Sequence, residues 1–260
     1  MQSEWCKAII GVVLPGAARE WIRKQRTRLR WPVVGLVRFG NLRRVRPISK
    51  VFGLDRGPRE RCIDIHYIER FLSEHAGDIC GRVLEIGDNT YTRKFGGARV
   101  AHSDVLHARG DNQNATIVAD LTAGDQIPSD AFDCIICTQT LQFIYDVHAA
   151  IRTLYRILKP GGVLLITFTG ISQISRYDMN RWGDYWRFTP KSAGMLIEEC
   201  WPSHGVTVET YGNVLLAVAY LHGLTTHELK SEELAYQDQD YPLVITIRAI
   251  KPGERAGDSR

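Results

Sequence analysis

Residues 82–97, RVLEIGDNTYTRKFGG, have the pattern of a first β-strand that leads into a ligand-binding turn. The apolar run contains an acidic residue near its end, Glu85, and Gly87 begins a polar turn before a helix-compatible segment closed by two glycines. In an open α/β sheet such a turn lies at the carboxyl end of the strand, where ligands bind. Because glycine has no Cβ, the backbone at Gly87 can turn sharply and lie against a ligand.

The residues around this turn favour one kind of ligand. A turn that binds pyrophosphate has the glycine pattern G-x-G-x-x-G, but Asn89 and Thr92 stand two and five positions after Gly87. Glu85 and Asp88 place carboxylates on either side of the turn, and these would repel a dinucleotide. They would suit a ligand that carries an ammonium and a sulfonium group, which S-adenosylmethionine offers.

At this point the chain resembles the class I S-adenosylmethionine-dependent methyltransferases, whose first motif is acidic-x-Gly-x-Gly-x-Gly. Glu85 and Gly87 match this motif, whereas Asn89 and Tyr91 replace the later glycines. Residues 132–169 are similar to the family's segment from the fourth to the fifth strand: an apolar run, a loop that contains glutamine, a helix, and the turn Leu-Lys-Pro-Gly-Gly. The resemblance covers roughly residues 65–251 and is to methyltransferases of type 11.

This resemblance implies an α/β fold: a Rossmann-like, seven-stranded, mostly parallel sheet with helices on both faces and a final antiparallel pair. We expect a basic N-terminal extension over residues 1–58, the methyltransferase domain over residues 59–251, and a disordered tail over residues 252–260. The expected cofactor is S-adenosyl-L-methionine.

Cofactor contacts are expected at the carboxyl ends of successive strands. Asp104, predicted to end a second strand that begins near Arg99, can accept hydrogen bonds from both ribose hydroxyls. The resemblance implies that Asp120 and the backbone after it hold the adenine amino group. The predicted cofactor-binding residues are Glu85, Gly87, Asp88, Asp104, Asp120, Leu121, Thr138 and Gln139.

Residues 171–190, ISQISRYDMNRWGDYWRFTP, follow the fifth predicted strand and gather aromatic and charged side chains at the expected mouth of the cleft. Such groups suit a sugar or another polar, polyhydroxylated acceptor, and the string DYWRFTP resembles bacterial methyltransferases that accompany glycosyltransferases. The predicted substrate-binding residues are Arg176, Tyr177, Trp182, Tyr185 and Trp186. The alternative is structural: Trp186 and Phe188 anchor this segment, while Thr189 caps the helix that Pro190 begins.

An alcohol acceptor would benefit from a base that takes its proton. Candidates are Asp178 and Asp184 in the segment just described, and also His204 and His222; Asp178 is favoured because Arg176 beside it could orient a polar substrate. The predicted activity is O-methylation of a sugar or similar small acceptor in glycan or secondary-metabolite synthesis. The alternatives are a cofactor-binding scaffold without transfer activity and a nucleotide-sugar or NAD-dependent enzyme.

Charge is concentrated at the N-terminus. Residues 1–50 carry twelve Lys and Arg against two acids, a net charge of +10, so the remaining 210 residues carry −6 of the total +4. This basic, tryptophan-containing arm is read in three ways: contact with an anionic membrane surface, binding of nucleic acid, or a solvated arm that packs on the acidic domain. Nucleic acid is not expected as a substrate.

The six cysteines are scattered, which does not indicate a disulfide framework and favours a reducing cytoplasm, with the arm at most peripheral to the inner face of the membrane. Cys134 and Cys137 form a C-x-x-C pair inside an apolar run, and residues three apart on a strand face opposite sides of the sheet. Both are predicted to be packing residues, and no metal site is predicted. No apolar run is long enough for a membrane span, and no signal peptide is expected.

Overall fold

The computed structural model describes residues 21, 44–55 and 61–253. The chain divides into two compact units, Met1–Val45 and Arg46–Arg260, and the second unit holds the whole sheet. The predicted basic extension is described only at Trp21 and residues 44–55, and the predicted tail only at residues 252–253; the rest of both lies outside the described residues.

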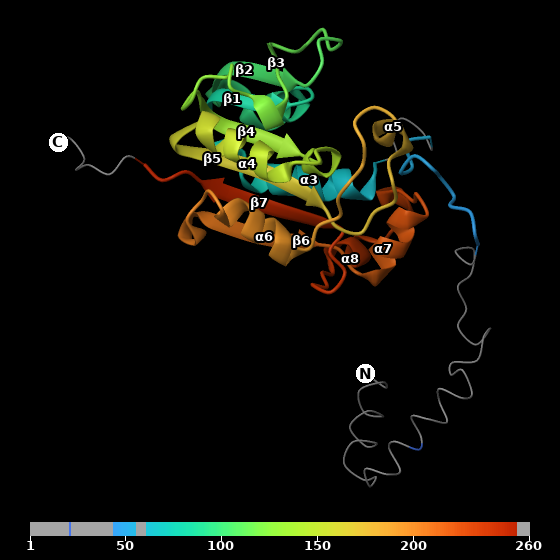
Figure 1. Cartoon of the computed structure of the whole chain (residues 1–260). Helices are drawn as coiled ribbons and strands as arrows, with labels where there is room; N and C mark the ends of the chain where they lie inside the picture. The colour runs from blue at the N-terminus through green and yellow to red at the C-terminus, as the bar shows by residue number, and fades with distance from the viewer. Residues whose placement is uncertain (1–20, 22–43, 56–60, 254–260) are drawn as a thin grey trace, which may run out of the picture. The chain divides into compact units, whose positions relative to one another are not determined.

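The second unit is built on one sheet with the strand order β3-β2-β1-β4-β5-β7-β6 (Figure 1). Neighbouring strands from β3 to β5 are parallel, and β7 is antiparallel to both β5 and β6. The strands are β1 (Gly81–Ile86), β2 (Val100–His107), β3 (Ile117–Val118), β4 (Phe132–Thr138), β5 (Leu158–Thr169), β6 (Val206–Tyr211) and β7 (Val244–Ile250). The predicted seven-stranded, mostly parallel sheet with its antiparallel closing pair is therefore confirmed.

The order of the strands fixes where a ligand can enter. From β1 the chain builds outward through β2 and β3, and then returns to place β4 on the other side of β1. The connections that leave β1 and β4 thus diverge to opposite halves of the sheet and open a crevice beyond their carboxyl ends. Gly87 and Gln139, the first residues after these two strands, lie at this crevice.

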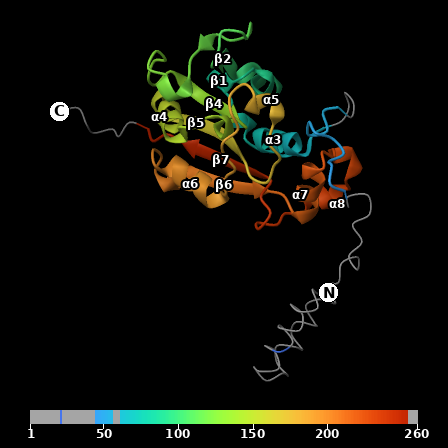
Figure 2. The same ribbon diagram turned by 45° about the vertical axis from the view of Figure 1, so that its right-hand side comes forward.

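Helices cover both faces of the sheet (Figures 1 and 2). On one face α4 (Val147–Ile157) and α6 (Pro190–Glu198) pack over a core cluster, and on the other face α3 (Ile63–Glu74) packs over a second cluster. The remaining α-helices are shorter: α5 (Arg176–Met179), α7 (Val214–Leu221) and α8 (Ser231–Ala235). This arrangement accounts for the continuous apolar runs of β4 and β5, which are buried on both faces.

Local sequence explains where the helices that flank the crevice begin. The Asp146 side chain accepts a hydrogen bond from the backbone N–H of Ala149 at the start of α4. At α6, Thr189 and Ser192 form a reciprocal capping box and Pro190 occupies the first helical position, which confirms the predicted cap.

Two predicted strands differ from the structure. The second strand does not end at Asp104 but continues to His107, and the third, predicted over residues 115–119, is only the two residues Ile117–Val118. In β2 the residues His102, Ser103 and Asp104 are polar because this part of the strand is partly exposed: the short edge strand β3 pairs only with Leu106 and His107 and does not reach it. A polar run near the edge of a sheet therefore does not mark the end of a strand.

The cysteines behave as packing residues. Cys134 and Cys137 are both fully buried, and they belong to the core clusters on opposite faces of the sheet, as predicted. Within the described residues the cysteines are free, and no group of His, Cys, Asp and Glu side chains is arranged to hold a metal ion. None of the helices in this part of the chain combines the length and the apolar character that crossing a membrane requires.

Candidate cofactor and acceptor pockets

The Glu85 side chain holds the segment after β1 in place through hydrogen bonds. Its carboxylate is buried, with 2% of the residue exposed, and accepts hydrogen bonds from the backbone N–H groups of Thr92 (2.7 Å) and Tyr91 (3.1 Å) and from the Thr92 hydroxyl (2.7 Å). Burial raises the pKa of Glu85, and the hydrogen bonds from Thr92 and Tyr91 oppose that rise. The predicted cofactor residue Glu85 thus fixes the segment that follows the turn, and it does not line the crevice.

Gly87 supplies the turn itself. Its φ is +94°, a conformation that side chains with a Cβ rarely adopt, and a Cβ built there would meet no atom within 4 Å. The backbone N–H of Gly87 donates to the carbonyl of Leu106 at 2.9 Å, which ties the turn to β2. The open space beside Gly87 belongs to a pocket.

This larger pocket has a volume of about 570 Å³ and lies at the carboxyl ends of β1, β2 and β4. Its walls combine apolar side chains, among them Ile86 and Phe143, with the carboxylates of Asp120 and Asp146. The lining residues, all of them described, include no lysine and no arginine. The pocket therefore fits a ligand with an apolar ring and a positive charge better than it fits a pyrophosphate, which supports the predicted cofactor.

The predicted cofactor-binding residues are only partly brought together here. Gly87, Asp120, Leu121 and Gln139 line the larger pocket, whereas Asp88 and Thr138 do not. The Asp88 carboxylate instead accepts a hydrogen bond from the backbone N–H of Thr90 at 2.8 Å. One Asp120 oxygen accepts from both the N–H and the hydroxyl of Thr122, which leaves the other oxygen available to a ligand.

Asp104 is not placed where the ribose contact was predicted. It lies three residues before the end of β2, where its carboxylate accepts from the Arg82 guanidinium at 2.7 Å and from the Thr116 hydroxyl at 2.9 Å. His107 occupies the end of the strand and lines the larger pocket, with its ring edge-on to that of Trp182 at 5.5 Å between centroids. His107 could not be identified from the sequence, because its position at the pocket depends on the full length of β2.

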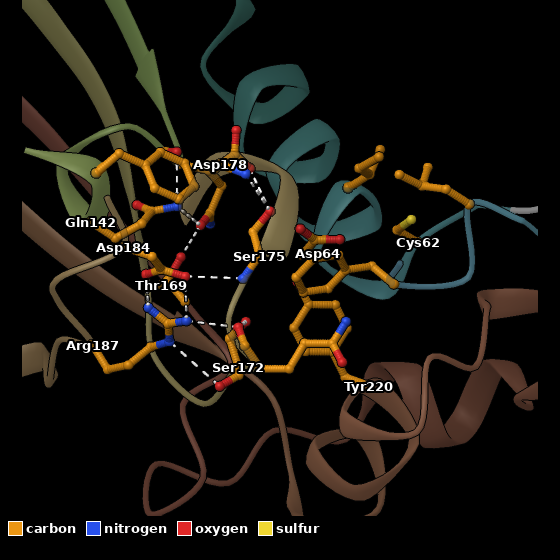
Figure 3. Close-up of a pocket in the computed structure, with 16 residues that line it drawn as sticks. Cys62, Asp64, Gln142, Thr169, Ser172, Ser175, Asp178, Asp184, Arg187 and Tyr220 are labelled. Carbon is orange, nitrogen blue, oxygen red and sulfur yellow. Dashed lines mark hydrogen bonds and ion pairs between the residues drawn. The ribbon is translucent and has the colours of Figure 1, made fainter. Parts of the chain in front are cut away.

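A smaller pocket of about 290 Å³ adjoins the larger one (Figure 3). Gln139 and Phe143 line both pockets, so a ligand in one would lie beside a ligand in the other. Gln139 has a positive φ of +47°, uncommon outside glycine, and its backbone N–H donates to the Thr167 carbonyl at 3.3 Å. Its side-chain oxygen accepts hydrogen bonds from Thr169 and from the amide of Gln142, which fixes it between the two pockets.

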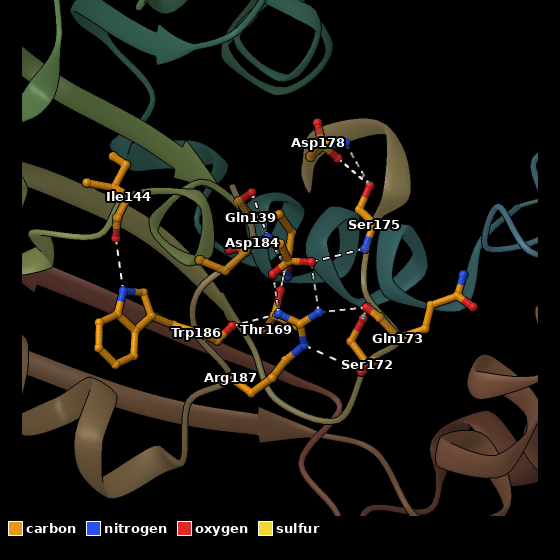
Figure 4. A network of polar contacts seen from close by, with 11 residues as sticks. Gln139, Ile144, Thr169, Ser172, Gln173, Ser175, Asp178, Asp184, Trp186 and Arg187 are labelled. Carbon is orange, nitrogen blue, oxygen red and sulfur yellow. Dashed lines mark hydrogen bonds and ion pairs between the residues drawn. The ribbon is translucent and has the colours of Figure 1, made fainter. Parts of the chain in front are cut away.

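The two predicted catalytic acids both line the smaller pocket. The Asp184 side chain is 1% exposed, and it accepts from the N–H of Ser175 (3.0 Å) and from both terminal nitrogens of Arg187 (2.5 and 3.0 Å) (Figure 4). Arg187 also donates to three backbone carbonyls of the same segment, so this ion pair holds residues 171–188 in place. Asp178 is more available to a ligand than Asp184, since its carboxylate accepts from the Ser175 hydroxyl at 2.5 Å and is not paired with any of the described arginines.

The predicted substrate-binding residues fall into three groups. Trp182 and Tyr185 line the larger pocket. Trp186 is an anchor, as the structural alternative proposed: its indole N–H donates to the Ile144 carbonyl at 3.0 Å, and its ring packs against the core. Arg176 and Tyr177 are exposed and line neither of the two pockets.

Among the residues of the smaller pocket that were not predicted from the sequence are Asp64 on α3, Gln142 after β4, and Tyr220 on α7. The signal for Asp64 was present, because it lies three and four residues before the buried Tyr67 and Ile68 and so shares the apolar stripe of α3. Burial raises the pKa of Asp64, and hydrogen bonds from the Ile65 backbone and the Tyr220 hydroxyl oppose that rise. Of the predicted histidines, neither His204 nor His222 lines either pocket.

Comparison with known proteins gives a match in the same region. Residues 81–166, from the start of β1 into β5, match a family described as "Methyltransferase domain". Among curated proteins, the ubiquinone/menaquinone biosynthesis C-methyltransferase UbiE of Pectobacterium carotovorum is 38% identical over 61 residues, 24% of each chain, and that of Pectobacterium atrosepticum is 49% identical over 39 residues, 15% of this chain and 16% of that one. The chain thus matches about a quarter or less of the length of these relatives.

Solved structures are similar over a longer stretch. A SAM-dependent methyltransferase from Archaeoglobus fulgidus is 12% identical, with a TM-score of 0.48 over 72% of this chain and 94% of that chain. An S-adenosylmethionine-dependent methyltransferase from Mesorhizobium loti is 16% identical, with a TM-score of 0.47 over 73% of this chain and 98% of that chain. The match of residues 81–166 to the methyltransferase domain, on a sheet of this order, supports a class I S-adenosylmethionine-dependent methyltransferase.

Proposed function

We propose that this protein binds S-adenosyl-L-methionine in the larger pocket and transfers its methyl group to an oxygen atom of a small polar acceptor in the smaller pocket. The observation that carries the proposal is the pair of adjoining pockets, which meet at Gln139 and Phe143 beyond the carboxyl ends of β1 and β4. When bound, the cofactor supplies a methyl group that is already activated by its sulfonium. The protein then has to hold donor and acceptor in line and exclude water, a contribution of several kcal/mol.

The lining of the larger pocket supports the choice of donor. Gly87 leaves the backbone bare beside the ligand, Asp120 offers a carboxylate oxygen, and Ile86 and Leu121 offer apolar contact for an adenine ring. An NAD-dependent enzyme would need bare N–H groups or a cation for the pyrophosphate, and the lining of this pocket contains no lysine or arginine.

The acceptor proposed is a sugar or a related polyhydroxylated molecule. Support comes from the smaller pocket, which has room for a molecule of about the size of a monosaccharide and is lined on one side by polar groups, among them Gln142, Ser172 and Asp178. The resemblance of residues 184–190 to methyltransferases that accompany glycosyltransferases is consistent with an acceptor in glycan synthesis.

Two measurements test this proposal. In calorimetric titrations, S-adenosylmethionine and S-adenosylhomocysteine are expected to bind with a stoichiometry of one, and NAD is expected not to bind. Formation of S-adenosylhomocysteine is then followed with a panel of monosaccharides, nucleotide sugars and amino sugars. Binding of the donor without transfer to any acceptor would favour the scaffold alternative, and preference for NAD would refute the assignment of the larger pocket.

A further inference from the structure

The smaller pocket contains two buried oxygen atoms that have no hydrogen-bond partner: Oδ1 of Asp64 and Oε1 of Gln142. Gln142 is only 4% exposed, and its side-chain nitrogen is fully used, donating to the backbone and side-chain oxygens of Gln139 at 2.8 and 3.2 Å. This hydrogen bonding assigns the free atom as the oxygen. Buried polar atoms are nearly always paired in folded proteins, so two unpaired atoms in one cavity indicate a missing partner.

Both unpaired atoms are acceptors, and this limits the chemistry of the partner. The hydroxyl donors of the pocket are already engaged: Ser172 donates to the Gln173 carbonyl at 2.9 Å, Ser175 to Asp178 at 2.5 Å, and Thr169 to Gln139. The Tyr220 hydroxyl is hydrogen-bonded to the Asp64 carboxylate, whose Oδ1 still has no partner among the described residues. A ligand that satisfies Asp64 and Gln142 must therefore itself supply hydrogen-bond donors. Figure 3 shows Asp64 and Gln142 on opposite sides of Ser175, so donors on two parts of one molecule would be needed to reach both.

The charged side chains of the smaller pocket indicate whether its ligand is neutral or cationic. Among the lining residues, all of them described, the ionisable acids are Asp64, Asp178 and Asp184, and Arg187 is the only cationic side chain. Because Arg187 is paired with Asp184, no lining cation is left to neutralise Asp64 or Asp178. A carboxylate closed off from water is unfavourable unless it is paired, so the ligand that restores the balance carries a positive charge.

The apolar wall of the pocket agrees with such a ligand. Phe52 and Tyr220 lie next to each other, with ring centroids 5.5 Å apart, and Phe143 lines the side shared with the larger pocket. Aromatic rings are favourable neighbours of ammonium groups and of the apolar face of a sugar ring. In Figure 3 the carboxylate of Asp64 lies beside the ring of Tyr220, which brings the acidic and aromatic parts of the wall together.

We propose that the smaller pocket recognises a cationic, hydroxyl-bearing acceptor, an amino sugar or an amino alcohol, whose ammonium group is paired with Asp64 and whose hydroxyl donates to Gln142. This inference rests on the proposed function only in naming the ligand as the methyl acceptor; the binding site itself does not depend on transfer activity. It excludes phosphorylated and carboxylated acceptors, because these would bring a negative charge next to unneutralised Asp64 and Asp178.

The test uses three small molecules of nearly equal size that differ in charge: serinol (2-amino-1,3-propanediol) as the ammonium, glycerol as the neutral triol, and glycerate as the anion. Their binding to the full chain is measured by saturation-transfer NMR titration, with and without S-adenosylhomocysteine. We expect serinol to bind on the order of tenfold more tightly than glycerol, as one well-placed opposite charge would give, and glycerate not to bind.

Substitutions assign the effect to the pocket. Asp64→Asn keeps the size of the side chain and is expected to remove the preference for serinol over glycerol, while Gln142→Met is expected to weaken both several-fold. Glu198→Gln, which removes an exposed charge on α6 and leaves both pockets unchanged, is the control and should bind as wild type does. Thermal unfolding and titration with S-adenosylhomocysteine confirm that each variant is folded.

Three results would overturn the inference: absence of serinol binding to wild-type protein, binding of glycerate as strong as that of serinol, or an unchanged serinol preference in Asp64→Asn. The comparison within the wild-type protein needs no variant, so it holds even if a substitution prevents folding. If the proposed function is wrong, S-adenosylhomocysteine will not bind to the wild-type protein, and this is measured separately from the binding of the three small molecules.

Discussion

At the scale of single residues, Gly87 combines a conformational requirement with an open position. Because its φ is +94° and a Cβ there would meet no neighbour, Gly87→Ala should cost about 1–2 kcal/mol through backbone strain alone, and the domain should stay folded. The added methyl group would enter the space of the ligand, so the affinity for S-adenosylhomocysteine should fall at least tenfold by calorimetry. Gly77→Ala is the matched control: it too has free space for a Cβ but no positive φ, and both stability and affinity should change little.

Asp104 and His107 offer a second comparison between neighbouring residues. Asp104→Ala breaks the ion pair with Arg82, whose guanidinium side chain is 42% exposed, so a loss of only about 1 kcal/mol in the free energy of unfolding is expected. The affinity for S-adenosylhomocysteine should not change. His107→Ala should show the opposite pattern, with stability nearly unchanged and affinity reduced several-fold, because the imidazole lines the pocket and packs on Trp182.

Urea unfolding and calorimetry of both variants check this assignment. If Asp104→Ala weakened the binding of S-adenosylhomocysteine more than His107→Ala did, the ribose contact originally predicted for Asp104 would be correct after all.

At the scale of elements, residues 171–188 depend on one buried ion pair. Arg187→Met removes the charged partner of Asp184 and leaves a carboxylate that is 1% exposed and still accepts a hydrogen bond from the Ser175 N–H. Amide hydrogen exchange in residues 171–188 should become faster, whereas exchange in β4 and β5 should stay as in wild type. Arg176→Met, an exposed arginine of the same segment that lines neither pocket, should leave exchange unchanged. Equal effects of the two substitutions would show that the ion pair does not hold the segment.

The helices and strands also differ in how well the sequence predicts them. The strands β1, β4 and β5 were found because they are apolar on both faces, and the caps of α6 because Thr189 and Pro190 are local signals. The end of β2 was misplaced because polar residues are tolerated in the part of β2 that the short edge strand β3 does not reach, so that Asp104 was taken as the end of the strand in place of His107. The role predicted for Asp104 therefore depended on a strand boundary that lies three residues further along the chain.

At the scale of the whole molecule, the smaller pocket, which is proposed to hold the acceptor, is assembled from segments far apart in the chain. Asp64 lies on α3, Gln142 follows β4, and Tyr220 lies on α7, so no local pattern joins them and only the order of the strands brings them together. The residues of the smaller pocket could thus not be identified from the sequence, although the turn after β1 that is proposed to bind the cofactor could. A pocket with two unpaired acceptors should also lower the stability of the ligand-free fold, as functional sites often do.

The burial of Asp64 leads to a prediction about how the free energy of unfolding depends on pH. Burial raises the pKa of Asp64 in the folded protein, so the folded state binds more protons at this site than the unfolded state, and wild-type stability should fall as pH rises from the ordinary aspartate pKa toward the raised value. Asp64→Asn cannot ionise and should lack this component. At neutral pH the variant should then be more stable than wild type by about 1–3 kcal/mol, the range for an unpaired buried polar group, with the gap closing as pH falls below the ordinary aspartate pKa.

Urea unfolding of both proteins between pH 4 and pH 8 measures this difference, since the other carboxylates are present in both proteins and largely cancel. Serinol should narrow the gap at neutral pH, because an ammonium group bound to ionised Asp64 stabilises the wild-type fold and not the variant. A variant that is less stable than wild type at neutral pH would mean that the hydrogen bonds from Tyr220 and the Ile65 backbone already compensate for the burial of the Asp64 carboxylate in the ligand-free protein. The carboxylate would then be a structural group, and the positive charge assigned to the acceptor would lose its physical basis.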